Sequence, residues 1–389
     1  YYIDSDGKQK LSLINKRAEE GDWGDWSKTL PSQFLSKQPL ELVRKQLNMA
    51  ISDKQAEYDE ICSLTNPTVK KNLLKSFADD CDSAAVHLQA AALPRQKYQV
   101  LLPLKTIKDN EVYAPNYKPG ETVALVRYPH GGTFEIPILK VNNKNSEGKK
   151  VIGTNPMDAI GINSKVAQQL SGADFDGDTV MVIPCNSLSS RVRIKAKAPL
   201  EALKDFDPKL EYGGKPEGTF RQMTKGNTQT EMGMISNLIT DMTIKGATDD
   251  EIAKAVKHSM VVIDANKHKL DYKQSEIDND IKTLKRNYQG RYDEDGRYHE
   301  GAATLISRAK SQTSVLKRQG SPIINKETGE QTWKTADKLT YTDKEGKVHV
   351  RTQKSTQMAE TRNAYTLSTG HPIENEYARY ANSMKSLAN

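Results

Sequence analysis

Gly172-Ala-Asp-Phe-Asp-Gly-Asp178, followed by Thr179-Val-Met-Val-Ile-Pro184, is the stretch that decides the fold of this chain. Its aspartates alternate along the backbone and would point to one face if the chain is extended. They are Asp174, Asp176 and Asp178. Gly177 allows a turn with a positive φ that other residues resist. Such a loop can gather three carboxylates around Mg²⁺, which takes oxygen ligands and keeps sites for phosphate and water, an arrangement typical of nucleotidyl transfer.

Other aspartate-rich loops bind Ca²⁺ or are solvated turns. An EF-hand loop that begins at Asp174 would need Gly at its sixth position and Glu at its twelfth, where this chain has Thr179 and Cys185. The sequence therefore excludes the EF-hand. A solvated turn stays open as an alternative, although the apolar segments on both sides favour a loop that is held on a packed sheet.

The motif Ala-Asp-Phe-Asp-Gly-Asp resembles the metal-binding signature of the two-barrel RNA polymerases. This family comprises the largest subunit of the cellular enzymes, the RNA-dependent polymerases of RNA silencing and single-chain phage polymerases. Arg127-Tyr-Pro129-His130 is similar to the Arg-x-Pro segment of the family. Downstream, Met232–Asn237 and His258–Asp264 resemble segments that follow the aspartate loop in the silencing branch.

The resemblance implies a double-psi β-barrel on which Asp174, Asp176 and Asp178 are catalytic and hold Mg²⁺, with Mn²⁺ as an alternative ion. A second Mg²⁺ would arrive with the nucleotide. Arg127, Pro129 and Gly177 would bind the substrate, and Arg127 would approach the ribose.

Two departures from the family concern the sugar and the triphosphate. Cellular members carry an Asn two residues before the first aspartate, which helps to recognise the 2′-hydroxyl, whereas this chain has Gly172; the silencing branch also carries a small residue there. The family needs a second barrel whose lysines face the triphosphate, and the sequence offers none. We expect that barrel upstream of Tyr1 or in another chain.

The composition is that of a charged protein with two or three domains. The chain has 389 residues and a formal net charge of +7, which permits a polyanionic partner without requiring one. Three scattered cysteines, Cys62, Cys81 and Cys185, lack metal-ligand spacing and suit a reducing cytoplasm. No apolar run approaches the length of a membrane span, so we expect no membrane contact.

We expect an α+β protein in which a double-psi β-barrel forms the catalytic core and helical segments flank it. Residues 1–94 are expected to be a mostly helical connector, 95–190 the barrel with the aspartate loop, 191–300 a helical region, and 301–389 a β-hairpin and a C-terminal helix. The absence of a first Met and the unfinished apolar pattern at Asn389 favour a piece of a longer protein.

Short β-rich runs separated by turn signals predict the barrel. They span residues 98–102, 122–126, 134–139 and 179–183, and 163–170 could be a short helix or turn. Residues 332–352 are expected to form a hairpin that turns at 344–347.

Apolar spacings of three and four predict the helices. One helical stretch covers residues 35–92 with a break at Asn66-Pro67. Thr248 and Glu251 form a capping-box signature. A final helix is predicted by the repeat of Ile373, Tyr377, Tyr380, Met384 and Leu387 at spacings of four and three. Residues 228–245 could cross the catalytic cleft and meet the nascent base pair, or could be only a packed amphipathic helix.

Several basic residues are candidates for nucleic-acid contact. Lys140, Lys149 and Lys150 precede the aspartate loop and could touch phosphate, or could be solvated hairpin tips. His258 and Lys267 could contact nucleic acid or serve acid–base chemistry, although a lone His is more often a cap or a hydrogen-bonded core residue.

The sequence therefore predicts the catalytic portion of a two-barrel RNA polymerase that adds ribonucleotides to an RNA 3′ end. The expected partners are a nucleic-acid template, the RNA product, ribonucleoside triphosphates and the second barrel. DNA is preferred over RNA as the template. The alternatives are a silencing-type RNA-dependent polymerase, a non-catalytic nucleic-acid-binding barrel and a Mg²⁺-dependent nuclease.

Overall fold

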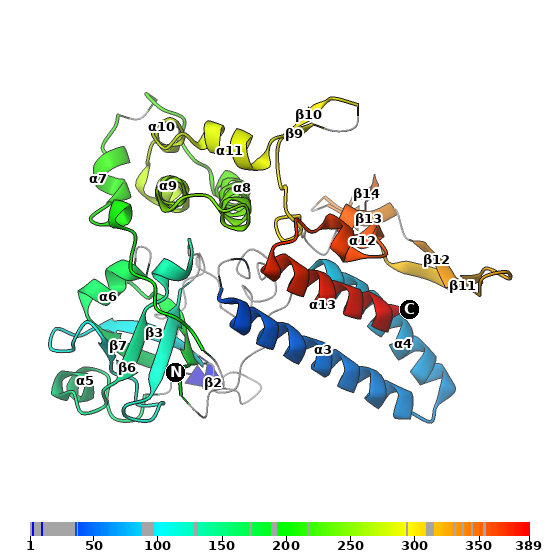
Figure 1. Cartoon of the computed structure of the whole chain (residues 1–389), viewed down its shortest axis with the longest axis horizontal. Helices are drawn as coiled ribbons and strands as arrows, with labels where there is room; N and C mark the ends of the chain where they lie inside the picture. Colours follow the sequence, from blue (N-terminus) through cyan, green and yellow to red (C-terminus); the bar gives the residue numbers. More distant parts are fainter. Residues whose placement is uncertain are drawn as a thin grey trace. The chain divides into compact units, whose positions relative to one another are not determined.

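The computed structural model forms two compact units, each with its own hydrophobic core (Figure 1). The first unit takes residues 1–26, 33–42 and 92–303, and the second takes 27–32, 43–91 and 304–389. The residues that the structure describes are 2–3, 9–10, 36, 38–87, 97–127, 131–156, 158–170, 173–187, 193–216, 218–292, 295–308, 315–329, 331–335, 338–343, 345–352 and 355–389. Expectations for Gly172, Pro129 and His130 lie outside them.

A nearly closed six-stranded barrel is the centre of the first unit. Its strands follow the order β4-β6-β5-β8-β3-β7. The pairs β4/β6 and β3/β7 are parallel and the other pairs are antiparallel. Tyr113 and Gly161 exchange backbone hydrogen bonds of 2.9 Å, which bring the two edges of the sheet together. The strands are β3 (Lys97–Pro103), β4 (Glu111–Val112), β5 (Thr122–Val126), β6 (Ile138–Val141), β7 (Ala159–Ile162) and β8 (Thr179–Pro184).

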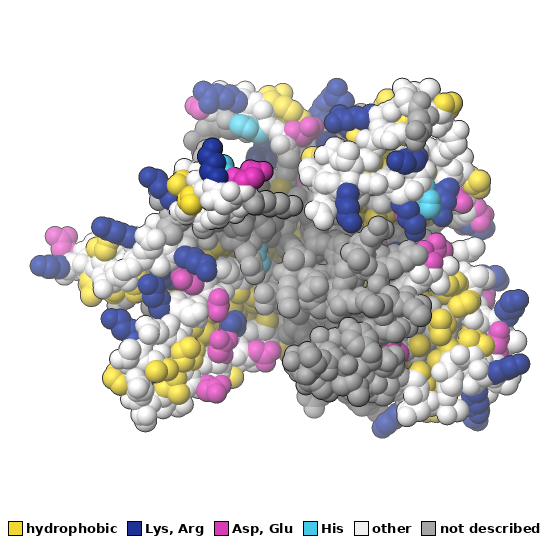
Figure 2. Space-filling view, turned by 180° about the vertical axis from the view of Figure 1, so that it is seen from behind, with side chains coloured by type: hydrophobic (Ala, Val, Ile, Leu, Met, Phe, Trp, Pro, Cys, Tyr) yellow, Lys and Arg dark blue, Asp and Glu magenta, His cyan; other side chains and the backbone are white. Residues whose placement is uncertain are grey.

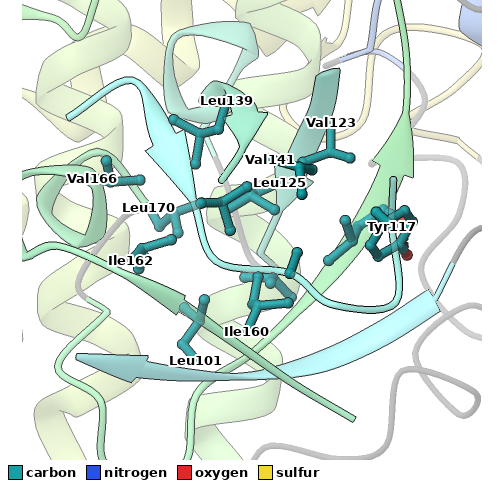
Figure 3. Close-up of a cluster of buried hydrophobic side chains, with 14 of the residues drawn as sticks. Leu101, Tyr117, Val123, Leu125, Leu139, Val141, Ile160, Ile162, Val166 and Leu170 are labelled. Atoms are coloured by element: carbon teal, nitrogen blue, oxygen red, sulfur yellow. Dashed lines mark hydrogen bonds between the residues drawn. The ribbon is translucent and has the colours of Figure 1, made fainter. Parts of the chain in front are cut away.

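The interior of the barrel is filled by aliphatic side chains (Figure 3). β5 and β8 are rich in β-branched residues and are buried along nearly their whole length, which suits strands covered on both faces. The core residues labelled in Figure 3 include Leu101, Val123, Leu125, Ile160, Ile162 and Leu170. β8 lies between β5 and β3, and its first residue, Thr179, pairs with Val100 of β3.

The short elements between the strands depart in part from the prediction. The expected strand at 134–139 is wrong at its start, because Thr133–Glu135 forms a 3₁₀ helix (η1) and β6 begins only at Ile138. Pro137 lacks the N–H that a ladder needs, and Phe134 packs into the helical region instead of the barrel. Residues 163–170, predicted as a short helix or turn, contain the helix α6 (Ser164–Gln169). A helix that was not predicted, α5 (Ser146–Val151), carries Lys149 and Lys150.

A group of helices packs beside the barrel in the first unit. α8 (Lys225–Ile244) and α9 (Asp249–His268) lie side by side, and α10 (Tyr272–Asp278) and α11 (Ile281–Gln289) pack on them (Figure 1). The predicted capping box is confirmed, since Thr248 and Glu251 satisfy each other's backbone N–H groups. The smaller elements are β1 (Tyr2–Ile3), β2 (Gln9–Lys10), η2 (Glu201–Leu203), α7 (Pro208–Tyr212), β9 (Arg291–Tyr292) and β10 (Tyr298–His299).

Helix α9 approaches the barrel at the segment that follows β5. A Cβ at Gly131 would come within 2.4 Å of Val256 on α9, so glycine is needed for this close packing. Phe134 joins the same contact, because its ring belongs to the cluster that contains Leu238 and Val256. The barrel and the helical region are thus joined by one apolar contact, called the seam below, that Gly131, Phe134 and Val256 form.

The second unit joins helices from both ends of the sequence. α4 (Pro67–Val86) packs against α13 (Pro372–Ala388), and the Tyr377 hydroxyl donates to the carbonyls of Ala85 and Val86. The predicted break at Asn66-Pro67 is confirmed, because Asn66 caps α4 and Pro67 begins it. The other elements are α3 (Leu40–Ser63), of which residues from 43 onward belong here, α12 (Gln357–Glu360) and η4 (Ala364–Leu367).

Two hairpins complete the second unit. The turn expected at 344–347 joins β13 (Lys338–Thr342) to β14 (Val348–Thr352), whereas β12 (Gln331–Thr335) pairs with β11 (Arg318–Ile324). The single hairpin predicted over 332–352 is therefore wrong at its beginning, because two hairpins meet there. Among the described helices, none combines the length and the apolar character that crossing a membrane requires.

Candidate metal centre on the barrel

The aspartate loop leads directly into β8, and its end is fixed to the neighbouring strand. The Asp178 carbonyl accepts a 2.9 Å hydrogen bond from Leu101 N on β3. Ala173 and Phe175 pack against the barrel core. The loop is thus held on a packed sheet, as the flanking apolar segments predicted, and is not a free solvated turn.

The carboxylates converge through a bend and not along an extended backbone, which corrects the expectation from their alternation. Phe175 has φ +64° and Gly177 has φ +117°, so two of five residues leave the extended region. The positive φ predicted for Gly177 is confirmed. Phe175 is not a glycine, so its positive φ costs conformational free energy. The contact of its ring with the barrel core offsets that cost.

Asp178 accepts the hydrogen bonds that hold the loop in its bent shape. Its side chain is buried, with 1% of its surface exposed. Oδ2 accepts hydrogen bonds from Asp174 N at 2.7 Å and Phe175 N at 3.1 Å. Oδ1 accepts from Arg127 Nε at 3.0 Å and Arg127 Nη2 at 2.7 Å.

Asp174 and Asp176 form the exposed part of the group. One carboxylate oxygen from each of the three aspartates lies within 4.8 Å of the others. Asp176 N also donates to Asp174 Oδ1 at 3.3 Å. Partial burial, and then the neighbouring carboxylates, raise the pKa of Asp174 above its ordinary value. Concentrated negative charge of this kind is relieved when a cation binds.

The donor set fits a hard divalent cation. Three carboxylates offer only oxygen, the ligand that Mg²⁺ and Mn²⁺ prefer, and their spacing allows one ion to reach more than one of them. Two of the three side chains face solvent, so an ion would keep positions for water or phosphate. The barrel therefore carries an acidic triad that could bind a metal ion.

Lys267 is the predicted basic residue that the structure brings to the triad. It lies in the last turn of α9, and its Nζ is 3.6 Å from Asp176 Oδ2. Both side chains are partly exposed, so this ion pair adds at most about 1 kcal/mol to stability. Its position beside the loop follows from the seam between α9 and the barrel.

The other basic candidates lie elsewhere. Lys140 is exposed on β6, where its Cα partners are Glu111 and Thr122. Lys149 and Lys150 are exposed on α5. Figure 2 shows lysine and arginine side chains scattered over the visible face, with acidic side chains between them.

His258 is a core residue. It is 4% exposed on α9, and its Nδ1 lies 3.0 Å from Ser275 Oγ. Burial lowers its pKa to about 4, so it stays neutral at physiological pH. This is the hydrogen-bonded core histidine that the sequence offered as the alternative, and its burial leaves little surface for nucleic acid.

Helix α8 contains nearly all of residues 228–245, for which the sequence left two interpretations open. Its second half is buried, with Ile235, Leu238 and Met242 in the helical core. Its first half is mostly exposed, and Met234 shows 42% of its surface. The packed amphipathic helix is therefore present, while contact with a nascent base pair stays a prediction.

Sequence reasoning missed the roles of Arg127 and Phe175 within the loop. Arg127 follows β5, and the sequence assigned it to the ribose, but two of its nitrogens donate hydrogen bonds to Asp178. No local pattern indicates this pairing, because it follows from β5 and β8 being neighbours in the sheet. For Phe175, the sequence offered one signal of a role in the loop, namely a bulky aromatic residue between two aspartates.

Fold and site together define an α+β protein whose nearly closed six-stranded barrel carries an acidic triad at the start of one strand. A scan of protein-family models gave no match, and a search of curated proteins gave none either.

Proposed function

We propose that this chain is the aspartate-bearing part of a two-barrel RNA polymerase, and that its barrel is of the double-psi type. The observation that carries the proposal is the convergence of three carboxylates within 4.8 Å on a barrel rim, in the sequence Ala-Asp-Phe-Asp-Gly-Asp. The six strands, with a parallel pair at each end of the sheet, support the barrel type.

Asp174, Asp176 and Asp178 would hold the metal. When bound, Mg²⁺ would supply Lewis-acid chemistry that lowers the pKa of the RNA 3′-hydroxyl and stabilises charge on the phosphates. Asp174 and Asp176 present the exposed oxygens, and Asp178 supports them from the interior. The glycine at 177 gives the bend that turns Asp176 toward Asp174.

Substrate and partners follow from the same resemblance. Arg127 and Pro129 would border the ribose of the incoming nucleotide, and lysines of a second barrel would neutralise its triphosphate. Lys267 lies close enough to Asp176 to meet phosphate oxygens held beside the metal. Because the second barrel would come from the full-length protein or another chain, we expect this chain alone to be nearly inactive.

Replacement of Asp176 tests the proposal. Asp176→Ala removes an exposed oxygen ligand, so RNA synthesis by the full-length or reconstituted enzyme should fall at least about 10²–10³-fold. Extension of a labelled primer measures the loss. Asp53→Ala, which removes an exposed carboxylate from α3, is the matched control and should retain synthesis. Synthesis at the wild-type rate by the Asp176 variant would refute the assignment.

The substrate arms of the same assay separate the alternatives. DNA and RNA templates, each with and without nucleotides, should give extension only with nucleotides, and we expect DNA to be copied. Extension on RNA alone would favour the silencing type. Cleavage without nucleotides would favour a nuclease, and binding without either reaction would favour a non-catalytic barrel.

A further inference from the structure

Arg127 joins two neighbouring strands at the rim of the barrel. It follows the last residue of β5, and Asp178 immediately precedes β8. Its Nε and Nη2 both donate to the same oxygen, Asp178 Oδ1, at 3.0 and 2.7 Å. The Arg127 side chain is only 14% exposed, so this charge-assisted pair is largely shielded from water.

The two oxygens of Asp178 have different partners. A carboxylate accepts about four hydrogen bonds, and four donors already reach this one. Oδ1 faces Arg127, and Oδ2 faces the amides of Asp174 and Phe175. Arg127 therefore fixes the orientation of the Asp178 carboxylate. Asp178 in turn fixes the backbone of the loop through the amides of Asp174 and Phe175.

We propose that Arg127 is a positioning residue that acts through Asp178 and thereby presents Asp174 and Asp176 to a divalent cation before any nucleotide arrives. The proposal rests on the proposed metal centre and deepens it. Asp178 serves mainly as the internal support of the loop, and the exposed pair Asp174 and Asp176 provides the primary ligands. Without Arg127, Asp178 would be a buried carboxylate that has lost its charged partner, and the loop would lose its shape.

A positioning role and a simple charge effect predict opposite changes in cation affinity when a cationic side chain is removed. Among the residues that the structure describes, Arg127 pairs with Asp178 and Lys267 pairs with Asp176. Removal of a positive charge near a cation site should tighten cation binding. Loss of a positioning residue should weaken it, since partners of metal ligands contribute about 10- to 100-fold to affinity.

The experiment measures Mn²⁺ binding to the whole 389-residue chain by electron paramagnetic resonance, without nucleotide and with Mg²⁺ as competitor. Arg127→Ala should bind Mn²⁺ about 10-fold or more weakly than the wild type. Lys267→Met should bind roughly 2- to 5-fold more tightly. Lys165→Met, which removes an exposed lysine from α6, controls for net charge and should match the wild type.

Arg127→Lys provides the conservative variant. It keeps the charge but cannot donate from two nitrogens fixed in one plane, so its affinity should lie between wild type and Arg127→Ala. Circular dichroism melts without cation identify variants that do not fold. If Arg127→Ala does not fold, the Mn²⁺ affinity of Arg127→Lys alone tests the positioning role.

Wild-type or tighter Mn²⁺ binding by either folded Arg127 variant would overturn the proposal. Failure of the wild-type chain to bind Mn²⁺ would overturn it as well. The predicted binding pattern without RNA synthesis in the reconstituted enzyme would leave Arg127 as the positioning residue of a metal site and refute the polymerase alone. Synthesis combined with unchanged Mn²⁺ binding in Arg127→Ala would refute only the positioning role of Arg127.

Discussion

Single residues decide the shape of the aspartate loop. Phe175 and Gly177 both adopt positive φ, yet only glycine does so without steric cost. The four hydrogen bonds of Asp178 and the contact of Phe175 with the barrel hold the bend in place. Strain that is stabilised in this way is typical of functional loops.

Gly177→Ala should weaken both the fold and the cation site. A Cβ at φ +117° costs about 1–3 kcal/mol, and any relaxation of the bend moves Asp176 away from Asp174. Urea unfolding and Mn²⁺ titration measure the two effects.

Gly233→Ala is the matched control for this change. Gly233 lies within α8, and a Cβ there would meet nothing within 4 Å. Alanine should therefore stabilise the helix by about 0.5–1 kcal/mol. Equal effects of the two substitutions would contradict the special role of the bend.

The sequence predicted the aspartates and the turn at Gly177 because these signals are local. It assigned Arg127 to the substrate and did not foresee the pair with Asp178. That pair joins residues 51 positions apart and depends on β5 lying beside β8, which no spacing within the chain encodes.

At the scale of elements, the helices of the first unit depend on a buried polar contact. His258 on α9 meets Ser275 on α10, and Asn279 Nδ2 donates to the Ser275 carbonyl at 2.9 Å. Ser275 and His258 are both buried, and this burial favours the uncharged imidazole.

Acid should therefore destabilise the protein through His258. Its pKa falls from 6.5 in the unfolded chain to about 4 in the fold, so the neutral form contributes its full stability above pH 6.5. Between pH 6.5 and 4 the unfolded state binds a proton that the folded state refuses, which costs up to about 3 kcal/mol. Urea unfolding at several pH values measures the slope.

His258→Gln should remove this part of the pH dependence, because glutamine stays neutral. The exposed His299→Gln serves as the control, because it makes the same substitution outside the core. An identical slope in wild type and His258→Gln would show that the histidine does not titrate in this window. His87, whose pKa burial also lowers to about 4, keeps its own contribution in both variants.

The strong apolar periodicity of the long helices made them predictable from the sequence, whereas the short strands were harder to predict. The last helix was foreseen from its apolar spacing, and Tyr377, Tyr380 and Met384 are buried as expected. The two-residue β4 and the glycine-containing β7 carry too little pattern to detect. In α4, Val69 and Leu73 are exposed although both belong to the apolar repeat of that helix.

At the scale of the whole molecule, the two units have separate cores but an interleaved sequence. The first unit holds the acidic triad, and the second is built by α3, α4, α12 and α13 with two hairpins. A ligand stabilises only the part that it binds, so cation binding should report on this division.

Hydrogen exchange with and without Mg²⁺ should separate the units. At 100 times the dissociation constant, Mg²⁺ adds about 2.7 kcal/mol, so the slowest amides of β8 should exchange roughly 100-fold more slowly. Amides of α13 should keep their rates. Mass spectrometry of peptides measures both. Asp174→Asn combined with Asp176→Asn should abolish the effect, and equal slowing in α13 would mean that the units open together.

The pairing of α4 with α13 has a consequence for biosynthesis. The Tyr377 hydroxyl meets the Val86 carbonyl across 291 positions, so α4 leaves the ribosome long before its partner is translated. At bacterial or eukaryotic elongation rates this delay is roughly 15–60 s. During that interval the face of α4 that bears Phe77 and Cys81 has no α13 to cover it, so the nascent chain exposes apolar surface that the finished protein buries.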